Sequence, residues 1–232
     1  MRLKQILFSQ GFGTRRECEA LIWHGLVQVG ERVLDDPDEE MDTTGLVFSV
    51  RGQQWPFHDK ALLMMNKPAG YECSRKPRHH PSVLSLLPAP LRQREVQPIG
   101  RLDEDTTGLL LLTDDGALIH KLTSPKWHVP KVYVADCADA VDPQQVQRLL
   151  DGVVLHDDPL PVRAEACEAI DERQLRMTLT EGKYHQVKRM IAAAGNHVSA
   201  LRREAFGTLV LPPDLAPGRW QWIERDAVAA GL

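Results

Sequence analysis

The segment GRLDEDTTGLLLLTDDG, residues 100–116, constrains the fold more than any other part of the chain. Four consecutive leucines, Leu109–Leu112, lie between acidic clusters, with Asp103, Glu104 and Asp105 before them and Asp114 and Asp115 after them. A short apolar run that is bounded by turn residues is typical of a strand buried in a sheet. We therefore expect an internal strand at Gly108–Thr113 with carboxylates at both of its ends.

Other segments of the chain predict a mixture of strands and helices around this strand. Strands are predicted at Ala61–Asn66, Lys131–Cys137 and Leu175–Thr180, and around Val198 and Leu209. Helices are predicted from Asp142–Pro143 to Gly152, and from Tyr184 to Ala194 before Gly195. Since these elements lack the regular rhythm of a doubly wound sheet, we expect an α+β fold.

A smaller module precedes this region. The residues from Thr14 to Glu17 have the form of a capping box, which predicts a helix that ends near Gly25. Alternation over Leu26–Leu34 predicts two strands joined by a tight turn, and Gly45–Val50 reads as a third strand. Arg51–Asp59 has no clean period, so the linker is expected there. The expected domains are residues 1–58 and 59–232.

Cysteine usage and hydropathy narrow the class of protein. The 4 cysteines are widely separated and show no regular spacing, so neither a disulfide framework nor a zinc knuckle is expected. No apolar run approaches the length that spans a membrane, and the N-terminal apolar stretch is broken by polar residues. We expect a soluble, cytoplasmic protein without a membrane partner.

Charge is clustered although the total is nearly balanced. Lys and Arg number 28 against 32 Asp and Glu, a net charge of −4, which argues mildly against a protein that coats nucleic acid. Basic residues nevertheless gather at Arg15–Arg16, Arg75–His80, Lys183–Arg189 and Arg202–Arg203. Four such clusters in one chain favour a polyanionic partner.

The acidic segment also allows two metal-site interpretations, and both are weak. Asp103, Asp105 and Asp114 partly match the spacing of an EF-hand loop, but its middle is a leucine run that requires burial. An Asp-x-Asp pair for catalytic magnesium would need a Gly-rich phosphate loop, and the sequence has none. His79 and His80 lack a third ligand close in sequence. We expect no metal site, and we expect Asp114–Gly116 to form a turn.

The same segment resembles the active-site segment of the ribosomal pseudouridine synthases, in which the Asp of a Gly-Arg-Leu-Asp element is the catalytic carboxylate. The resemblance therefore implies that Asp103 is that carboxylate. Residues 1–58 resemble an S4 RNA-binding domain through Arg15–Arg16 and GLVQVG, and three more motifs follow in the family's order: NKPAG, KVYVADC and EGKYHQVKRM. For residues 59–232 the family implies a mixed, mainly antiparallel sheet.

The resemblance also implies a chemistry and its residues. Isomerisation of uridine to pseudouridine involves no redox change and no hydrolysis, so no cofactor is expected. The carboxylate must stay ionised beside the RNA backbone and needs a cation, which we assign to Lys188, with Arg189 as the alternative. Tyr133 would stack on the uracil or move a proton. The residues expected to bind RNA are Arg15, Arg16, Lys67, Arg75, Arg78, Arg101 and Arg189.

Three motifs, HPSVL, DEDTTGL and GKYHQVKRM, are closest to family members that modify 16S rRNA. The expected partner is therefore 16S rRNA, free or in an assembling small-subunit particle, and the protein is expected to be a monomer. Two alternatives stay open, namely the same reaction on 23S rRNA, and a non-catalytic RNA-binding or ribosome assembly factor. The sequence leaves open whether Asp103 attacks C1′ or the base, or assists a glycal route.

Overall fold

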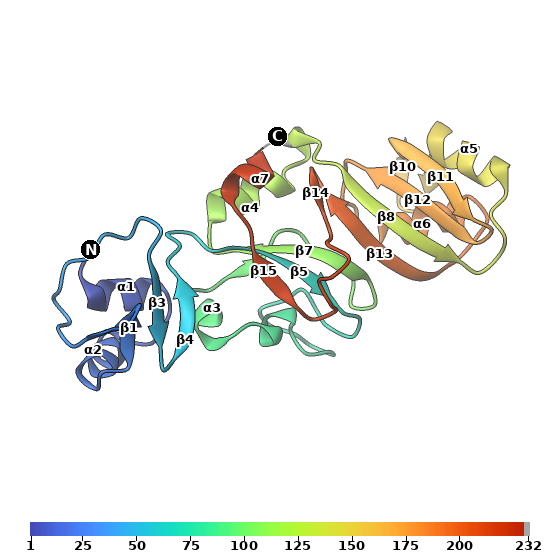
Figure 1. Ribbon diagram of the computed structural model, residues 1–232. Coiled ribbons are helices and arrows are strands. Elements are labelled where there is room, and N and C mark those ends of the chain that lie inside the picture. The colour runs from blue at the N-terminus through green and yellow to red at the C-terminus, as the bar shows by residue number, and fades with distance from the viewer. Residues whose placement is uncertain (230–232) are drawn as a thin grey trace. The chain divides into compact units, whose positions relative to one another are not determined.

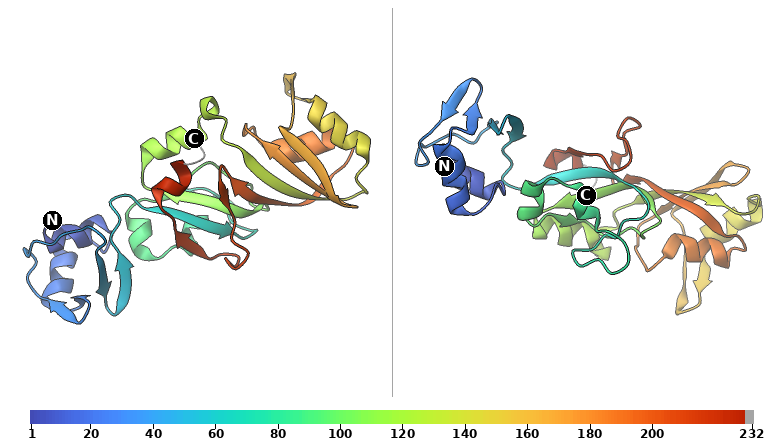
Figure 2. Two further views of the ribbon diagram at one scale, coloured as in Figure 1. Left: turned by 45° about the horizontal axis from the view of Figure 1, so that its top comes forward. Right: turned by 90° about the horizontal axis from the view of Figure 1, so that it is seen from below.

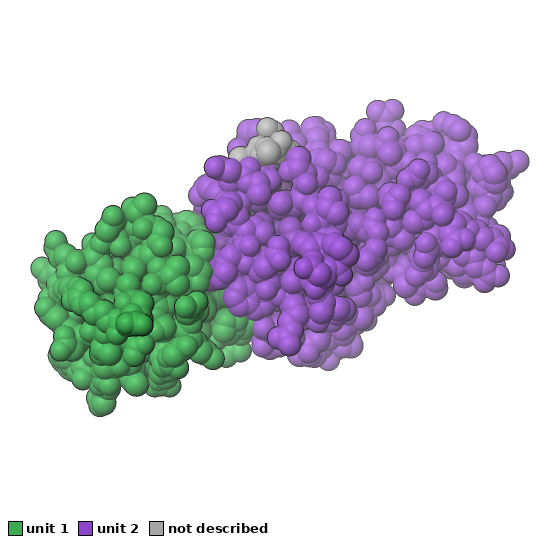
Figure 3. Space-filling model, in the orientation of Figure 1, with its two compact units in different colours: residues 1–61, 87–97 green, residues 62–86, 98–232 purple. Residues whose placement is uncertain are grey.

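A computed structural model describes residues 1–229 of the chain, which forms two compact units (Figure 3). Unit 1 contains Met1–Ala61 and Leu87–Gln97, and unit 2 contains Leu62–Leu86 and the chain from Pro98 onward. The sequence does not predict that Leu87–Gln97 returns to the first unit.

The helices are α1 (Leu3–Ser9), α2 (Arg15–Trp23), α3 (Ala89–Gln93), α4 (Gly116–Thr123), α5 (Pro143–Asp151), α6 (Gln186–Ala193) and α7 (Arg225–Ala229). The strands are β1 (Val27–Val29), β2 (Arg32–Leu34), β3 (Val47–Val50), β4 (Gln53–Pro56), β5 (Leu62–Lys67), β6 (Gln97–Pro98), β7 (Thr107–Thr113), β8 (Lys131–Cys137), β9 (Val153–Leu155), β10 (Asp158–Val162), β11 (Ala166–Asp171), β12 (Gln174–Leu179), β13 (Val198–Phe206), β14 (Leu209–Val210) and β15 (Trp220–Trp222). Within residues 1–229, no helix is both long and apolar enough to span a membrane.

Unit 1 is a four-stranded antiparallel sheet, in the order β2-β1-β3-β4, with helices α1 and α2. The predicted capping box is confirmed, because the Thr14 side chain accepts the Glu17 N–H and the Glu17 carboxylate accepts the Thr14 N–H. Phe12 closes the core of this unit with edge-on contacts to Phe48, at 5.6 Å, and to Trp55, at 5.3 Å.

Two elements of unit 1 differ from the prediction. The segment expected to be a linker contains β4, which pairs with β3. The turn between them places Arg51 at φ 53° and Gly52 at φ 78°, as a tight hairpin turn requires, although Arg51 is not a typical residue for it. Helix α1 was not predicted, because Arg2 at its N-cap is not a usual capping residue and no basic residue marks its last turn.

Unit 2 is built on a nine-stranded sheet in the order β11-β12-β8-β13-β7-β5-β15, with β14 on β13 and β6 on β7. The β7–β13 pair is parallel, whereas β5–β7, β8–β12 and β8–β13 are antiparallel. The long pair β8–β13 stays side by side in every view (Figures 1 and 2). The prediction of an α+β fold with a mainly antiparallel sheet is confirmed.

Two apolar cores fix this sheet. In the first, Leu109 and Leu111 of β7 and residues of β5 pack against α4, α7 and Phe206. All four leucines, Leu109–Leu112, are fully buried, as predicted. In the second, α5 and α6 cover β8 and β12 through Leu149, Val187, Met190 and Ile191. Burial of this apolar area is the main source of stability of the unit, and it holds the ends of β7 and α6 in place.

The acids that follow the leucines begin a helix, whereas a simple turn was predicted. Asp115 is the N-cap of α4, since its carboxylate accepts the N–H groups of Ala117 and Leu118. It also pairs with Arg225, at 2.9 Å. Burial opposes ionisation of Asp115, but these amides and Arg225 hold its pKa below the usual value. The position of Asp115 is therefore explained by capping.

Candidate active site

Asp103 lies in the tight turn that precedes β7. The Asp103 carbonyl accepts the Thr106 N–H at 3.2 Å, and the Asp103 side chain is 27% exposed. Gly108 allows this turn to enter the sheet, because a Cβ there would lie 2.3 Å from the Arg203 carbonyl oxygen of β13. Its φ of +101° also excludes ordinary side chains. The backbone of the turn is thus fixed on the side of β13.

Lys67 fixes the same turn from the other side. Its ammonium is fully buried and donates to three carbonyl oxygens, those of Thr106 at 2.8 Å, Glu104 at 2.9 Å and Pro68 at 3.0 Å. Burial holds the pKa of Lys67 below its usual value. The structure thus encloses the Lys67 ammonium in the turn that carries Asp103, and binding of RNA by Lys67 stays a prediction.

Helix α6 supplies a cation to the acidic turn. Lys188 donates to both carboxylate oxygens of Asp105, at 2.7 and 2.8 Å, and its Nζ lies 3.4 Å from Asp103 Oδ2. Partial burial opposes ionisation, but the Asp105 hydrogen bond and the two carboxylate charges raise the pKa of Lys188. The same contact lowers the pKa of Asp105 against the opposing effect of burial. The structure thus brings Asp103 and Lys188 together and adds Asp105, which the sequence suggested only as a possible metal ligand.

His185 is a second side chain at Asp103 that the sequence analysis did not identify. It is the N-cap of α6, it has a left-handed φ of 48°, and its Nε2 lies 3.3 Å from Asp103 Oδ1. Its ring stacks on Tyr184, with centroids 3.8 Å apart. A left-handed conformation is uncommon for residues other than glycine, and histidine is among those that adopt it more often. No local sequence pattern marks this position, since the segment reads only as a basic motif.

Tyr133 lies in the middle of β8 and is partly buried against the α5–α6 core. The register places it opposite Arg203 of β13, which is itself opposite Gly108 of β7. Tyr133 is therefore two strands away from the strand that follows Asp103. Within residues 1–229 its hydroxyl has no hydrogen bond to Asp103 or Lys188.

The basic cluster Arg75–His80, here called the basic loop, folds around the carboxylate of Glu72. Glu72 accepts the backbone N–H groups of His79 at 2.8 Å, His80 at 2.9 Å and Arg78 at 3.1 Å. These three hydrogen bonds lower the pKa of Glu72 to about 2. The Arg75 and Arg78 side chains are exposed on this loop.

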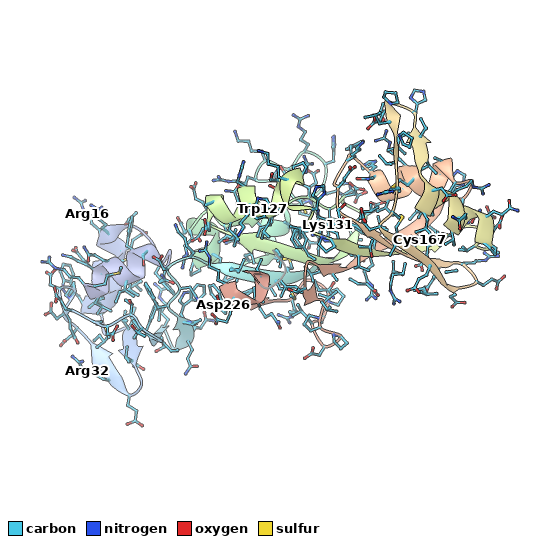
Figure 4. All side chains as sticks on the ribbon, turned by 90° about the horizontal axis from the view of Figure 1, so that it is seen from above. Arg16, Arg32, Trp127, Lys131, Cys167 and Asp226 are labelled. Atoms are coloured by element: carbon cyan, nitrogen blue, oxygen red, sulfur yellow. The ribbon has the colours of Figure 1, made fainter. Side chains whose placement is uncertain are left out.

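The other arginines expected to bind RNA differ in whether they are exposed to solvent or paired within the protein. Arg101 is exposed next to the acidic turn. Arg189 is engaged within the protein, since it pairs with Asp157 and donates to the Tyr184 carbonyl at 3.0 Å. Arg15 and Arg16 are exposed at the start of α2 in unit 1, and Figure 4 shows Arg16 extending into solvent.

Within residues 1–229, no three His, Cys, Asp or Glu side chains are grouped so that they could hold a metal ion. The chemical groups that converge at Asp103 are instead a carboxylate pair, an ammonium and an imidazole. This set can stabilise charge and move protons.

Comparisons with known proteins match both units. Residues 61–193 match the family model of RNA pseudouridylate synthases, and residues 1–43 match the S4 domain. The ribosomal small subunit pseudouridine synthase A of Escherichia coli is 42% identical over 75% of this chain and 74% of its own. That of Pasteurella multocida is 34% identical over 99% and 98%. A crystal structure of a pseudouridylate synthase matches the full length of both chains with a TM-score of 0.71 and 30% identity.

Proposed function

Because this chain belongs to the RNA pseudouridylate synthase family and begins with an S4 domain, we propose that it converts one uridine of 16S rRNA into pseudouridine, with Asp103 as the catalytic carboxylate. The reaction breaks the N1–C1′ glycosidic bond, turns the uracil and forms a C5–C1′ bond. C5 loses a proton and N1 gains one. The atoms balance without an oxidant, a reductant or water, so the reaction requires no cofactor.

The surroundings of Asp103 carry this proposal. Its carboxylate lies between Lys188 Nζ, at 3.4 Å, and His185 Nε2, at 3.3 Å, on a turn that Lys67 and β13 hold. A carboxylate that must act beside the anionic RNA backbone needs such a cation to remain ionised. Attack on C1′, attack on the base and a glycal route all use this same ionised carboxylate.

Other residues take supporting roles in this proposal. Tyr133 presents an aromatic plane that stacks on the uracil, or a hydroxyl that moves a proton. Arg101 fills the place of the flipped nucleotide or binds a phosphate, because the target must leave its stack before C1′ becomes accessible. Arg75 and Arg78 bind phosphates that flank the target. The loop fixed by Glu72 supports this last role, since a preorganised loop loses little entropy on binding.

The proposal that 16S rRNA is the substrate rests on the names of similar proteins. Two similar proteins are named for the small ribosomal subunit, and one of them aligns with 99% of this chain. The S4 domain, with exposed Arg15 and Arg16, supports docking on RNA through phosphates. We expect the protein to act as a monomer in the cytoplasm, on free 16S rRNA or on an assembling small-subunit particle.

The test is to incubate the purified protein separately with 16S transcript, assembling small-subunit particles and 23S transcript, and to map pseudouridine in each. We expect one modified site, confined to the 16S samples. Modification confined to 23S rRNA would reassign the substrate while Asp103 kept its role. A protein that binds these RNAs and modifies none would instead be a binding or assembly factor.

A further inference from the structure

Tyr184 is unusually exposed for an aromatic residue. Its side chain is 76% exposed, the largest fraction among the exposed large apolar side chains of residues 1–229. One face of its ring lies on the His185 ring, with centroids 3.8 Å apart and an angle of 19° between the planes. The other face is open. An aromatic ring that served only packing would be expected to bury both faces.

This open ring stacks on a side chain that contacts Asp103, and the backbone beneath it is hydrogen-bonded to α6. His185, on which Tyr184 stacks, lies 3.3 Å from Asp103 and takes a left-handed φ of 48°. Arg189 donates to the Tyr184 carbonyl at 3.0 Å, and its backbone N–H donates to the His185 carbonyl at 3.0 Å. The two rings therefore form a stack beside Asp103 that ends in an open aromatic face.

The basic residues around Tyr184 are paired with acids within the protein, so the segment does not act on RNA through charge alone. The cations of this segment already have acidic partners, since Lys183 pairs with Asp158, Lys188 with Asp105, and Arg189 with Asp157. What Tyr184 adds to the surface is a flat aromatic plane. Unpaired RNA bases stack on such planes, and stacking tolerates any base because every base has a π-face.

We propose that the open face of Tyr184 binds the nucleobase next to the uridine that reacts, in single-stranded RNA. This inference rests on the proposed function, because it takes the uridine at Asp103 as its reference point. The stack of Tyr184 on His185, which contacts Asp103, places the second base beside the reacting one. Tyr184 then positions the RNA chain and takes no part in bond making.

The test combines two variants with altered RNA. Tyr184→Ala removes the ring, and Tyr184→Phe keeps it as the matched control. The substrate is a short single-stranded RNA that spans the uridine the enzyme modifies, with either its 5′ or its 3′ neighbour replaced by an abasic nucleotide. We expect Tyr184→Ala to raise KM about five- to hundredfold on intact RNA, with kcat nearly unchanged, and Tyr184→Phe to behave as wild type.

The abasic substrates give the decisive comparison. On one of them, wild type and Tyr184→Ala should have the same KM, because the base that stacks is already missing. The inference is overturned if Tyr184→Ala matches wild type on intact RNA, or if its defect persists unchanged on both abasic substrates. Because a stack carries no net charge, the defect should also be the same at low and high salt.

Failure of the proposed function would be visible separately. If wild type modifies no RNA, binding of a fluorescently labelled single-stranded oligoribonucleotide still tests whether the open face of Tyr184 binds a base. Weaker binding by Tyr184→Ala and unchanged binding by Tyr184→Phe would support the aromatic site without the reaction. Equal binding by all three proteins would reject it.

Discussion

Lys188 donates to both carboxylate oxygens of Asp105 at 2.7 and 2.8 Å, closer than its 3.4 Å approach to Asp103. One cation of α6 therefore serves two acids of the same turn. Asp105 anchors the ammonium, and Asp103, which is 27% exposed, receives its charge at a slightly longer distance. This relationship explains why acids crowd the start of β7, since one of them orients the cation that the other needs.

This arrangement predicts different effects for the two partners. Lys188→Met should lower kcat by at least about a hundredfold, because the charge beside Asp103 is lost. Asp105→Asn should lower it by only about tenfold or less, since Lys188 remains but is less well anchored. The measurement is release of tritium from uridine labelled at C5. Near-normal turnover by Lys188→Met would show that Asp103 does not depend on this cation.

The buried Lys67 predicts a stability effect that an RNA-binding lysine would not show. Lys67→Met should lower the free energy of unfolding by about 2–5 kcal/mol, because three carbonyl oxygens lose their donor. Lys126→Met changes an exposed lysine of the same unit and serves as the control. Chemical denaturation measures both. If the two variants are equally stable, the ammonium does not hold the turn in solution.

The lowered pKa of Lys131 predicts that the free energy of unfolding increases with pH in the alkaline range. Burial, and secondarily the charge of Arg203, lower the pKa of Lys131 from 10.5 to about 8. The unfolded chain therefore binds the proton more tightly, and the charged form costs stability below pH 8. This cost, about 1–2 kcal/mol after allowance for partial exposure, should fade between pH 8 and 10.5.

Comparison with Lys131→Met isolates this effect from other titrations. The variant should gain stability relative to wild type at pH 7, and the gain should shrink as the pH rises from 8 to 10.5. Denaturant unfolding at several pH values measures the difference. A gain that does not change over this range would contradict the shifted pKa.

The hydrogen bonds to Glu72 are expected to keep the backbone of the basic loop ordered. Glu72→Gln should speed hydrogen exchange at the amides of Arg78, His79 and His80, which lose an ionised acceptor. Because the pKa of Glu72 falls from 4.5 to about 2 on folding, its contribution is complete above pH 4.5 and is lost toward pH 2. The stability difference between wild type and variant should therefore shrink over this acid range. Unchanged exchange in the variant would argue against a loop built on Glu72.

The S4 domain predicts a salt-dependent effect. Replacing both Arg15 and Arg16 with Ala should weaken RNA binding and reduce the slope of log affinity against log salt by about 1.4 to 1.8, two phosphate contacts. The rate at saturating RNA should change little. Arg32→Ala is a control in the same unit, because Arg32 is exposed but paired with Glu39 (Figure 4). An unchanged slope in the double variant would place RNA docking elsewhere.

Local chemistry decided which elements could be predicted. Helix α5 has Asp142 as N-cap, Pro143 in its first turn and Gly152 at its end, so its bounds were predicted nearly to the residue. The bounds of β8 were predicted from the alternating pattern of KVYVADC. Strand β4 was missed because Gly52 and Pro56 read as loop signals, whereas its pairing with β3 is a tertiary contact.

The site residues were predictable only where they belong to a motif of the family. Spacing alone cannot bring Lys188 to Asp103, because 85 residues separate them, and the family resemblance supplied that pair. The structural role of Lys67 could not be predicted, because a lysine takes such a role only when a distant turn folds its carbonyls around it. The left-handed His185 is likewise a product of tertiary packing, and no pattern in the sequence encodes it.

The most direct test of the whole account is turnover by Asp103→Asn. The change keeps the shape of the side chain and removes its charge, so folding and RNA affinity should stay close to wild type. Asp214→Asn, which alters an exposed carboxylate of the same unit, is the control and should keep full activity. The account predicts no pseudouridine from Asp103→Asn, measured on the RNA that wild type modifies. Measurable turnover, in a preparation free of wild-type enzyme, would contradict it.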